Sequence, residues 1–110
     1  MPSTDDFLAI DIRIGTIVQA DPFPAAKKPA IKLLIDFGPD IGLRRSSAQL
    51  TIHYTPATLI GRQIAAVVNI GERNIGGFIS QVLVLGALPQ PGEVVLLGVD
   101  HAVANGTKVG

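Results

Sequence analysis

The stretch over residues 61–87 constrains the fold of this chain more than any other part of its sequence. It reads GRQIAAVVNIGERNIGGFISQVLVLGA, in which two apolar runs flank a polar segment. The runs over 63–70 and 80–87 are rich in aliphatic and β-branched residues, which predicts two strands. Residues 71–79, which we call the elbow, carry a cation, an amide and an aromatic ring on a glycine-containing backbone. We expect the rest of the chain to build a small barrel that holds the elbow rigid.

Period-two patterns along the remaining sequence predict further strands. The first covers residues 10–20, and the glycine at position 15 in its middle predicts a bulge or a sharp bend. Alternation places one set of its residues on a common face: Ile10, Ile12, Ile14, Thr16, Val18 and Ala20. The other predicted strands cover residues 31–37, 43–52 and, near the C-terminal end, 93–99.

Two short helices are predicted. A hydroxyl followed by acidic residues favours a helical turn over 5–9, which must dock on something because it is too short to be stable alone. The second helix begins at Pro56, with Thr55 as its N-cap, and ends at Gly61. The segment over 21–30 contains three prolines and is therefore predicted to be a loop.

This order of elements predicts an all-β fold. Five or six short strands with one small helix between the third and the fourth are typical of a five-stranded OB-fold barrel. An SH3-like barrel and a β-sandwich are the alternatives, and the position of the helix favours the OB-fold. The chain has 110 residues, which fit one domain over 1–110 with short N- and C-terminal extensions.

Composition excludes several classes of protein. There is no cysteine, so disulfide frameworks and thiolate metal sites are ruled out. The formal net charge of zero argues against a bulk electrostatic nucleic-acid binder but leaves room for a local basic patch. The N-terminus lacks a basic region and a long apolar run, so we expect no signal peptide, no membrane insertion and a cytoplasmic protein.

The last strands are apolar on both faces. This holds for the run over 80–87 and again for residues 94–99. A barrel strand in a monomer should alternate apolar and polar residues, so something must cover the outside of the barrel. We therefore predict a homodimer, the commonest oligomer.

Motifs for catalysis and for metal binding are missing from the sequence. Neither His53 nor His101 has HxxxH or HExxH spacing, and no nucleophile-elbow sequence is present. The elbow also lacks the lysine of a phosphate-binding P-loop. We therefore expect no enzyme activity, no cofactor and no metal.

The third predicted strand is unusually polar. It contains Arg44, Arg45, Ser46 and Ser47, and alternation allows only one of the two arginines to share a face with Ser46. This polarity suits either a solvated face or a ligand groove, because OB-folds bind oligomers across the face of strands two and three.

The elbow and the proline loop supply further candidates. Arg73 is either solvated or paired with a phosphate, and Phe78 is either a core residue or a platform for a stacked base. The amide of Asn69 could satisfy backbone groups. Lys27 and Lys28 are expected to be exposed in the loop.

Four segments of the chain resemble one known family. They are DIRIGTIVQADPFPAAKKPAIKLLIDFG, RRSSAQL, LIGRQIAAVVNIGERNIGGFISQVLVLGA and VVLLGVDHAVANGTKVG. Together they are similar to CsaA-like secretion chaperones, which are stand-alone relatives of the tRNA-binding domain of methionyl-tRNA synthetase. The resemblance runs from Phe7 to Gly110, and KPA, SSAQ, VVN and SQVLVLG follow in the family's order and spacing.

The resemblance implies a non-catalytic OB-fold homodimer that binds tRNA or structured RNA and, in the CsaA branch, unfolded or exported polypeptides. It maps the elbow motif of the family onto Asn69, Arg73, Phe78 and Ser80, the serine pair onto Ser46 and Ser47, and the basic loop position onto Lys28. Arg45 and Asn74 join them from the pattern of the chain itself, which makes the complete predicted RNA- or peptide-binding site.

The sequence departs from the family directly after Asn69. Relatives have an aromatic residue and two prolines there, whereas this chain has Ile70, Gly71 and Glu72. A less rigid elbow and a negative charge beside Arg73 weaken the case for phosphate binding more than the case for a peptide groove.

Two ligand hypotheses remain at this point. RNA would be held by Lys28, Arg45 and Arg73, with a base stacked on Phe78. An unfolded or exported polypeptide would instead lie in an apolar groove near Ile75, Phe78 and Ile79.

Overall fold

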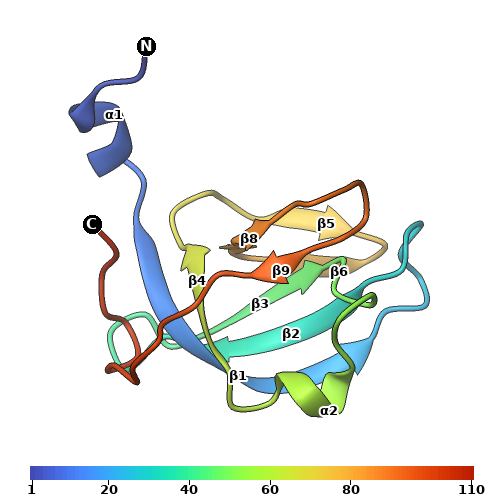
Figure 1. Cartoon of the computed structure of the whole chain (residues 1–110). Coiled ribbons are helices and arrows are strands. Elements are labelled where there is room, and N and C mark those ends of the chain that lie inside the picture. Colours follow the sequence, from blue (N-terminus) through green and yellow to red (C-terminus); the bar gives the residue numbers. More distant parts are fainter.

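Five strands form one antiparallel sheet that curls into a nearly closed barrel (Figure 1). The computed structural model describes every residue from 1 to 110. Neighbouring strands in the sheet follow the order β3-β2-β1-β4-β7. Their bounds are β1 Ile12–Pro22, β2 Ile31–Asp36, β3 Leu43–Ala48, β4 Gln63–Val67 and β7 Leu83–Val84.

Two short hairpins and two short helices complete the fold. One hairpin joins β5 (Arg73–Ile75) to β6 (Phe78–Ser80), and the other joins β8 (Gly86–Ala87) to β9 (Val95–Leu96). Helix α1 covers Thr4–Leu8, and α2 covers Pro56–Leu59 between β3 and β4. The structure therefore confirms the predicted all-β barrel with a short helix between its third and fourth strands.

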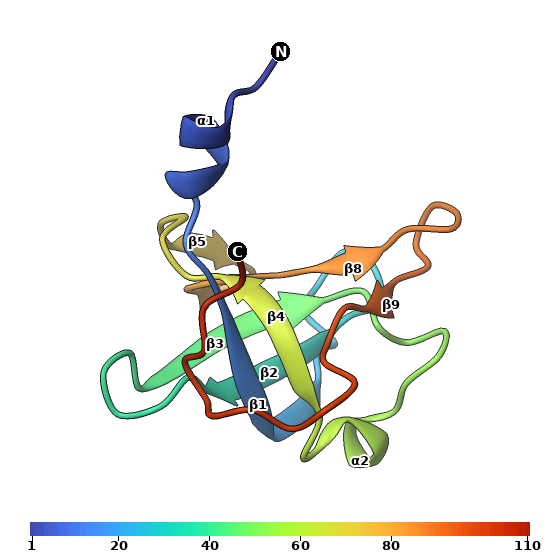
Figure 2. The same ribbon diagram turned by 60° about the vertical axis from the view of Figure 1, so that its left-hand side comes forward.

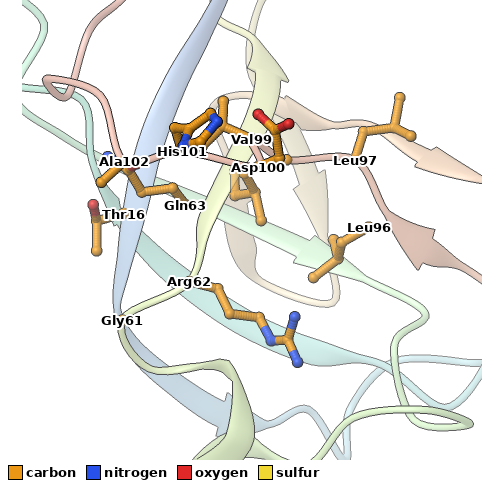
Figure 3. A pocket seen from close by; sticks show the side chains of 12 residues that line it. Thr16, Gly61, Arg62, Gln63, Leu96, Leu97, Val99, Asp100, His101 and Ala102 are labelled. Atoms are coloured by element: carbon orange, nitrogen blue, oxygen red, sulfur yellow. The ribbon is translucent and has the colours of Figure 1, made fainter.

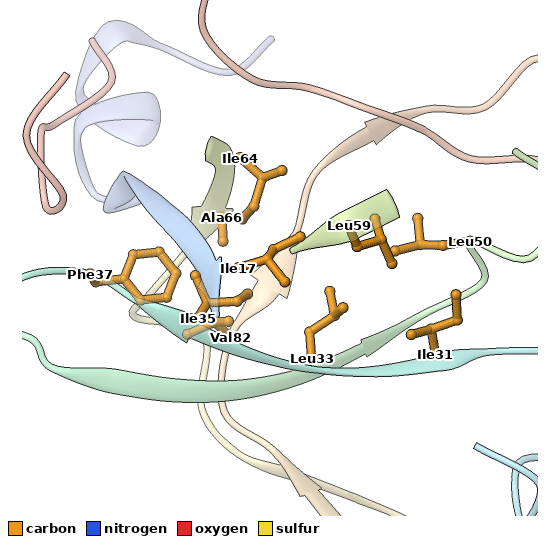
Figure 4. Packing of buried hydrophobic residues seen from close by; sticks show 10 residues of the cluster. All are labelled: Ile17, Ile31, Leu33, Ile35, Phe37, Leu50, Leu59, Ile64, Ala66 and Val82. Atoms are coloured by element: carbon orange, nitrogen blue, oxygen red, sulfur yellow. The ribbon is translucent and has the colours of Figure 1, made fainter. Parts of the chain in front are cut away.

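The core lies inside the barrel, where side chains from all sides of the sheet meet (Figure 4). Strand β2 supplies it by simple alternation, because Ile31, Leu33 and Ile35 are buried while the residues between them are only partly so. Each such side chain contributes about 1.5–3 kcal/mol on burial. The cluster consists of Ile17, Ile31, Leu33, Ile35, Phe37, Leu50, Leu59, Ile64, Ala66 and Val82.

Strand β1 differs from its prediction in bounds and in orientation. It begins and ends two residues later than expected, and its pairing with β2 shifts register between Ile17 and Gln19. This bulge leaves Val18 exposed and brings Ala20 back against the core. The prediction that Val18 and Ala20 share a face was therefore wrong, because an irregular strand breaks the period of two.

Gly15 has a different role from the predicted bulge. A Cβ at this position would lie 2.7 Å from both Ile35 Cγ2 and Phe37 Cδ1, so the glycine faces the core and leaves room for it. Ile14 is buried on the opposite face. The C-terminal segment pairs with β1 at this point, since the Ile14 N–H donates to the Thr107 carbonyl at 2.9 Å.

The barrel closes between β3 and the chain that follows β6, where Gln81 pairs with Arg45. The Gln81 N–H donates to the Arg45 carbonyl at 2.7 Å, and the Arg45 N–H donates to the side-chain Oε1 of Gln81 at 2.9 Å. The amide side chain thus takes the place of a backbone carbonyl in the ladder.

The apolar run over 80–87 is not one strand, as was predicted, but parts of three. The run changes partners along its length. Gln81 pairs with β3, the residues of β7 pair with β4, and the residues of β8 pair with β9. The Leu85 N–H still donates to the Ala65 carbonyl at 2.9 Å. A segment that closes a barrel must turn from one edge to the other, which explains the breaks. The strands predicted over 43–52, 63–70 and 93–99 are likewise shorter in the structure.

Helix α1 stands clear of the barrel (Figure 1; Figure 2). It begins one residue earlier than predicted because Ser3 forms a capping box with Asp6. None of its residues is buried, so it docks on nothing within the chain. The C-terminal segment returns to the start of β1, where the backbones of Lys108 and Arg13 form an antiparallel β-bridge. Neither helix has the length and apolar character that crossing a membrane would require.

Candidate nucleic-acid interface

The outer face of β2 and β3 presents a row of polar and basic side chains. Register pairs Lys32 with Ser47 and Leu34 with Arg45, whereas Arg44 pairs with the fully buried Ile35. Cross-strand partners share a face. Arg45 and Ser47 therefore face outward, and Arg45 is the exposed arginine of the strand. This assigns Arg45, not Arg44, to the outer face of the sheet.

An aromatic and cationic cluster lies at one end of this face. The rings of Phe23 and Phe78 meet edge to face with centroids 5.4 Å apart. The Lys32 Nζ lies 5.6 Å from the Phe23 centroid and 5.7 Å from the Phe78 centroid, within the range of cation–π attraction. We call these three residues the Lys32 cluster.

The Lys32 cluster depends on contact between the proline loop and the elbow. Phe23 belongs to the loop, and Phe78 belongs to β6. A Cβ on Gly76 would lie only 3.2 Å from the Ala25 carbonyl oxygen, so the two segments touch at their backbones. The proline loop and the elbow, which are far apart in the sequence, thus build one surface.

The elbow is a tight hairpin rather than an irregular bend. Its two turn residues, Gly76 and Gly77, have φ angles of 56° and 87°, as a type I′ turn requires. The Gly77 N–H donates to the Asn74 side-chain Oδ1 at 2.9 Å, so Asn74 shapes the turn. Arg73 is exposed on the same hairpin.

Ser46 and Ser80 are buried, with 0% and 1% of their surface exposed. Both hydroxyls donate to the Val82 carbonyl, at 3.0 Å and 3.4 Å. The Ser46 bond joins β3 to the segment that follows β6, whereas the Ser80 bond is local to that segment. Any contribution that the two serines make to ligand binding passes through the position of the elbow, because their hydroxyls are already paired inside the protein.

Asn69 is used elsewhere in the fold. Its Oδ1 accepts from the Asp11 N–H at 2.9 Å, and its Nδ2 donates to the Ala9 carbonyl at 2.9 Å. These bonds fasten the link between α1 and β1 to the end of β4. The structure therefore does not bring Asn69 to the Lys32 cluster.

Exposed cations and carboxylates share this interface, since Asp21 is exposed and pairs with Lys32 in the register of β1 and β2. Lys28 is exposed in the proline loop beside Lys27, and Arg45 and Arg73 are exposed on β3 and β5. Glu72 is not ion-paired with Arg73, since its carboxylate accepts from the Gln81 Nε2 at 3.4 Å. Glu72 therefore does not neutralise its neighbour, and the Arg73 guanidinium is not ion-paired within the protein.

The sequence-based prediction did not include two members of the candidate site, Phe23 and Lys32. Strand alternation places Lys32 on the outer face of β2, and that signal was available in the sequence. Phe23 carried no such signal, because only the contact of the loop with the elbow brings it to Phe78.

A wide hollow of the molecule is lined by other residues than this interface. It has a volume of about 770 Å³ and runs between the start of β4 and residues 96–102 (Figure 3). Arg62 lines it, but its guanidinium lies 5.1 Å from the centroid of the Tyr54 ring. None of the residues predicted to bind a ligand lines this hollow.

An antiparallel five-stranded barrel with a cationic and aromatic outer face defines a binding module of the OB class. A family model described as a tRNA binding domain matches residues 12–108 of the chain. The chain therefore belongs to the tRNA binding domain family.

Solved structures narrow the comparison. The crystal structure of the chaperone CsaA from Bacillus anthracis strain Ames is 50% identical, with a TM-score of 0.96, and the match covers 100% of this chain and 99% of that one. The CsaA chaperone protein from Picrophilus torridus is 44% identical over the full length of both chains, with a TM-score of 0.91. This chain is thus similar to CsaA chaperones from end to end.

Curated relatives include much longer proteins. The methionine–tRNA ligase of Parabacteroides distasonis is 30% identical over 107 residues, which are 96% of this chain and 15% of the ligase. The chain therefore spans about 15% of the length of such ligases.

Proposed function

We propose that this chain is a non-catalytic RNA-binding module of the CsaA type that acts in the cytoplasm as a dimeric, export-related chaperone. It binds tRNA or other structured RNA across the outer face of β2 and β3. The observation that carries this proposal is the Lys32 cluster, in which an ammonium and two aromatic rings are held together beside the exposed Arg45.

The face offers RNA two kinds of contact. Lys28, Arg45 and Arg73 are exposed cations and supply phosphate contacts. Phe78 remains partly exposed and supplies a ring face, and a base stacked on such a ring contributes about 1–3 kcal/mol. Lys32 stands between the two kinds of contact and neutralises a phosphate next to the stacked base.

The test is a fluorescence titration of bulk tRNA with the purified protein at low and near-physiological salt. Four phosphate contacts predict that affinity falls about 50- to 150-fold when salt rises fourfold. Arg73→Ala should weaken binding and flatten this salt dependence by about one contact. The reason is that Arg73 projects from the hairpin with no partner in the protein.

Lys108→Ala provides the matched control, because Lys108 is an exposed cation in the C-terminal segment. We expect it to weaken tRNA binding less than Arg73→Ala does. Equal losses from both variants would show that diffuse charge, rather than the hairpin, holds the RNA. No tRNA binding at low salt would contradict the hypothesis that the chain binds RNA.

The dimer is proposed on the apolar surface that the chain leaves uncovered. Helix α1 exposes Phe7 and Leu8 and buries nothing, and Leu97 and Val99 are exposed near β9. A five-residue helix needs a packing partner to persist in water. Multi-angle light scattering should therefore give twice the chain mass, and a monomer at micromolar concentration would contradict the proposal.

Unfolded or exported polypeptides are the second candidate ligand. Ile75 and Phe78 are partly exposed and pair across the hairpin, so an apolar segment could lie against both, while Ile79 is partly exposed on the other face. Apolar burial responds weakly to salt, whereas phosphate contacts respond steeply. Binding of an unfolded client that keeps its affinity as salt rises, in a protein that does not bind tRNA, would favour this function.

A further inference from the structure

A second cavity, of about 320 Å³, lies at the mouth of the barrel where β1 begins. It is lined by residues of β1, of the turn between β2 and β3, of the end of β4 and of the C-terminal segment. Barrel mouths are common places for small-molecule sites, and this volume is at the small end of their range. None of the exposed cations of the proposed RNA interface lines the cavity.

Arg44 reaches this mouth because of strand alternation. It pairs with Ile35, so it lies on the inner side of β3, and its position near the strand's start places it above the core. Its one hydrogen bond within the protein runs from Nη1 to the Leu43 carbonyl at 3.1 Å. A guanidinium has five N–H donors, so most of them remain available.

Asp40 supplies the opposite charge in the same cavity. Its carboxylate accepts no hydrogen bond within the protein and is not ion-paired, not even with Arg44. The other two charges of the lining, Arg13 and Asp11, already pair with each other at 2.6 Å. Arg44 and Asp40 are therefore the two charges left for a ligand.

An amide completes the polar lining. The Oδ1 of Asn105 accepts from the Thr16 hydroxyl at 2.7 Å and from the Gln63 Nε2 at 3.2 Å. Its NH₂ group has no partner in the protein, although Asn105 lines the cavity. The mouth thus offers two donor groups, on Arg44 and Asn105, and one acceptor group on Asp40.

The floor of the cavity is apolar and the rim is rigid. Phe37 is 1% exposed, and Ile41 and Val68 pack against the same core. The C-terminal segment presses on the turn so closely that a Cβ on Gly38 would lie 2.6 Å from the Asn105 carbonyl oxygen. The turn and the C-terminal segment are therefore packed backbone to backbone at the rim.

We propose that this cavity binds a free α-amino acid with an apolar side chain. Its carboxylate pairs with Arg44 and the Asn105 amide, its ammonium pairs with Asp40, and its side chain lies on Ile41 and Val68. A ligand with one charge would leave the opposite charge of the cavity unanswered, whereas a zwitterion matches both. The volume admits one such molecule.

The test uses L-leucine as the probe, with the full-length protein, in saturation-transfer NMR and isothermal titration calorimetry. Saturable binding with a Kd in the millimolar range is expected for a molecule this small. L-leucinamide lacks the carboxylate and N-acetyl-L-leucine lacks the ammonium, so each should bind at least tenfold more weakly. Glycine should bind more weakly too, because it has no side chain for the apolar floor.

Two variants assign the charges. Arg44→Gln should weaken leucine and N-acetyl-leucine alike, because both carry the carboxylate. Asp40→Asn should weaken leucine about tenfold yet leave N-acetyl-leucine unchanged, a pattern that general loss of structure would not produce. Arg62→Gln, which removes a cation outside this cavity, serves as the control and should keep the affinity of the wild type.

Three results would overturn the proposal. They are no saturable leucine binding at tens of millimolar, equal affinity for leucine and leucinamide, and equal loss from Arg62→Gln and Arg44→Gln. The proposal does not rest on RNA binding, so its failure would leave the proposed function untouched.

Discussion

Substituting Gly15 by alanine tests the packing at the centre of the barrel. The new Cβ would lie 2.7 Å from Ile35 Cγ2 and from Phe37 Cδ1, whereas carbon atoms in contact are about 3.5–4.0 Å apart. Both neighbours are at most 1% exposed, so neither can move into solvent. Overpacking of this kind costs about 1–3 kcal/mol. The lower entropy of the unfolded alanine chain returns about 0.4–1 kcal/mol.

The net destabilisation should therefore be about 1–2 kcal/mol, within the range found for core overpacking. Urea unfolding followed by circular dichroism measures it. With an m-value of about 1–3 kcal/mol per molar urea, the midpoint should fall by roughly 1 M. Gly15 does not have a positive φ, so backbone strain does not contribute to this cost.

A double-mutant cycle with Phe37→Leu isolates the steric clash between the new Cβ of residue 15 and the ring of Phe37. Leucine is smaller than phenylalanine, so Gly15→Ala should cost less in that background than in the wild type. Gly92→Ala provides a control of another kind. It has φ of 81° and no atom within 4 Å of its Cβ, so its cost comes from the backbone and should not depend on residue 37. A wild-type midpoint for Gly15→Ala, or equal costs in both backgrounds, would refute the reasoning.

Two smaller predictions follow from side-chain hydrogen bonds. Asn69→Ala should speed hydrogen exchange at the Asp11 amide, whose acceptor it removes, whereas Asn74→Ala should leave that exchange unchanged. Ser46→Ala should lower the free energy of unfolding by about 1 kcal/mol, because a buried donor to Val82 is lost. Ser47→Ala, on the outer face, should stay within about 0.5 kcal/mol, and a larger effect there would contradict the assignment of faces.

The sequence predicted the fold best where one face of a strand is buried and the strand is regular. Strand β2 met both conditions, and its inward residues were correctly identified. Strand β1 did not, because a bulge changes the parity at Val18 and the distant C-terminal segment pairs with the start of the strand. Neither a bulge nor pairing with a distant segment leaves a trace in local alternation.

The candidate site was predictable in chemistry but not in geometry. Exposure of Arg45 and Arg73 follows from their charge, and both are exposed in the structure. Burial of Ser46 could not be foreseen, since serine is usually at the surface and only the Val82 carbonyl explains its position. Phe23 belongs to the candidate site only because the proline loop contacts Phe78 of β6, and that contact depends on the whole fold.

The way in which Gln81 closes the barrel has a consequence for solubility. Without its side chain, the Arg45 N–H would be an unpaired donor on the edge of β3, open to any extended chain. Unpaired strand edges are where proteins recruit one another into aggregates. A protein proposed to hold unfolded polypeptides meets such chains continually, so its own edge must be unavailable to them. The Gln81 side chain occupies the Arg45 N–H, so a bound polypeptide cannot extend the sheet at this position.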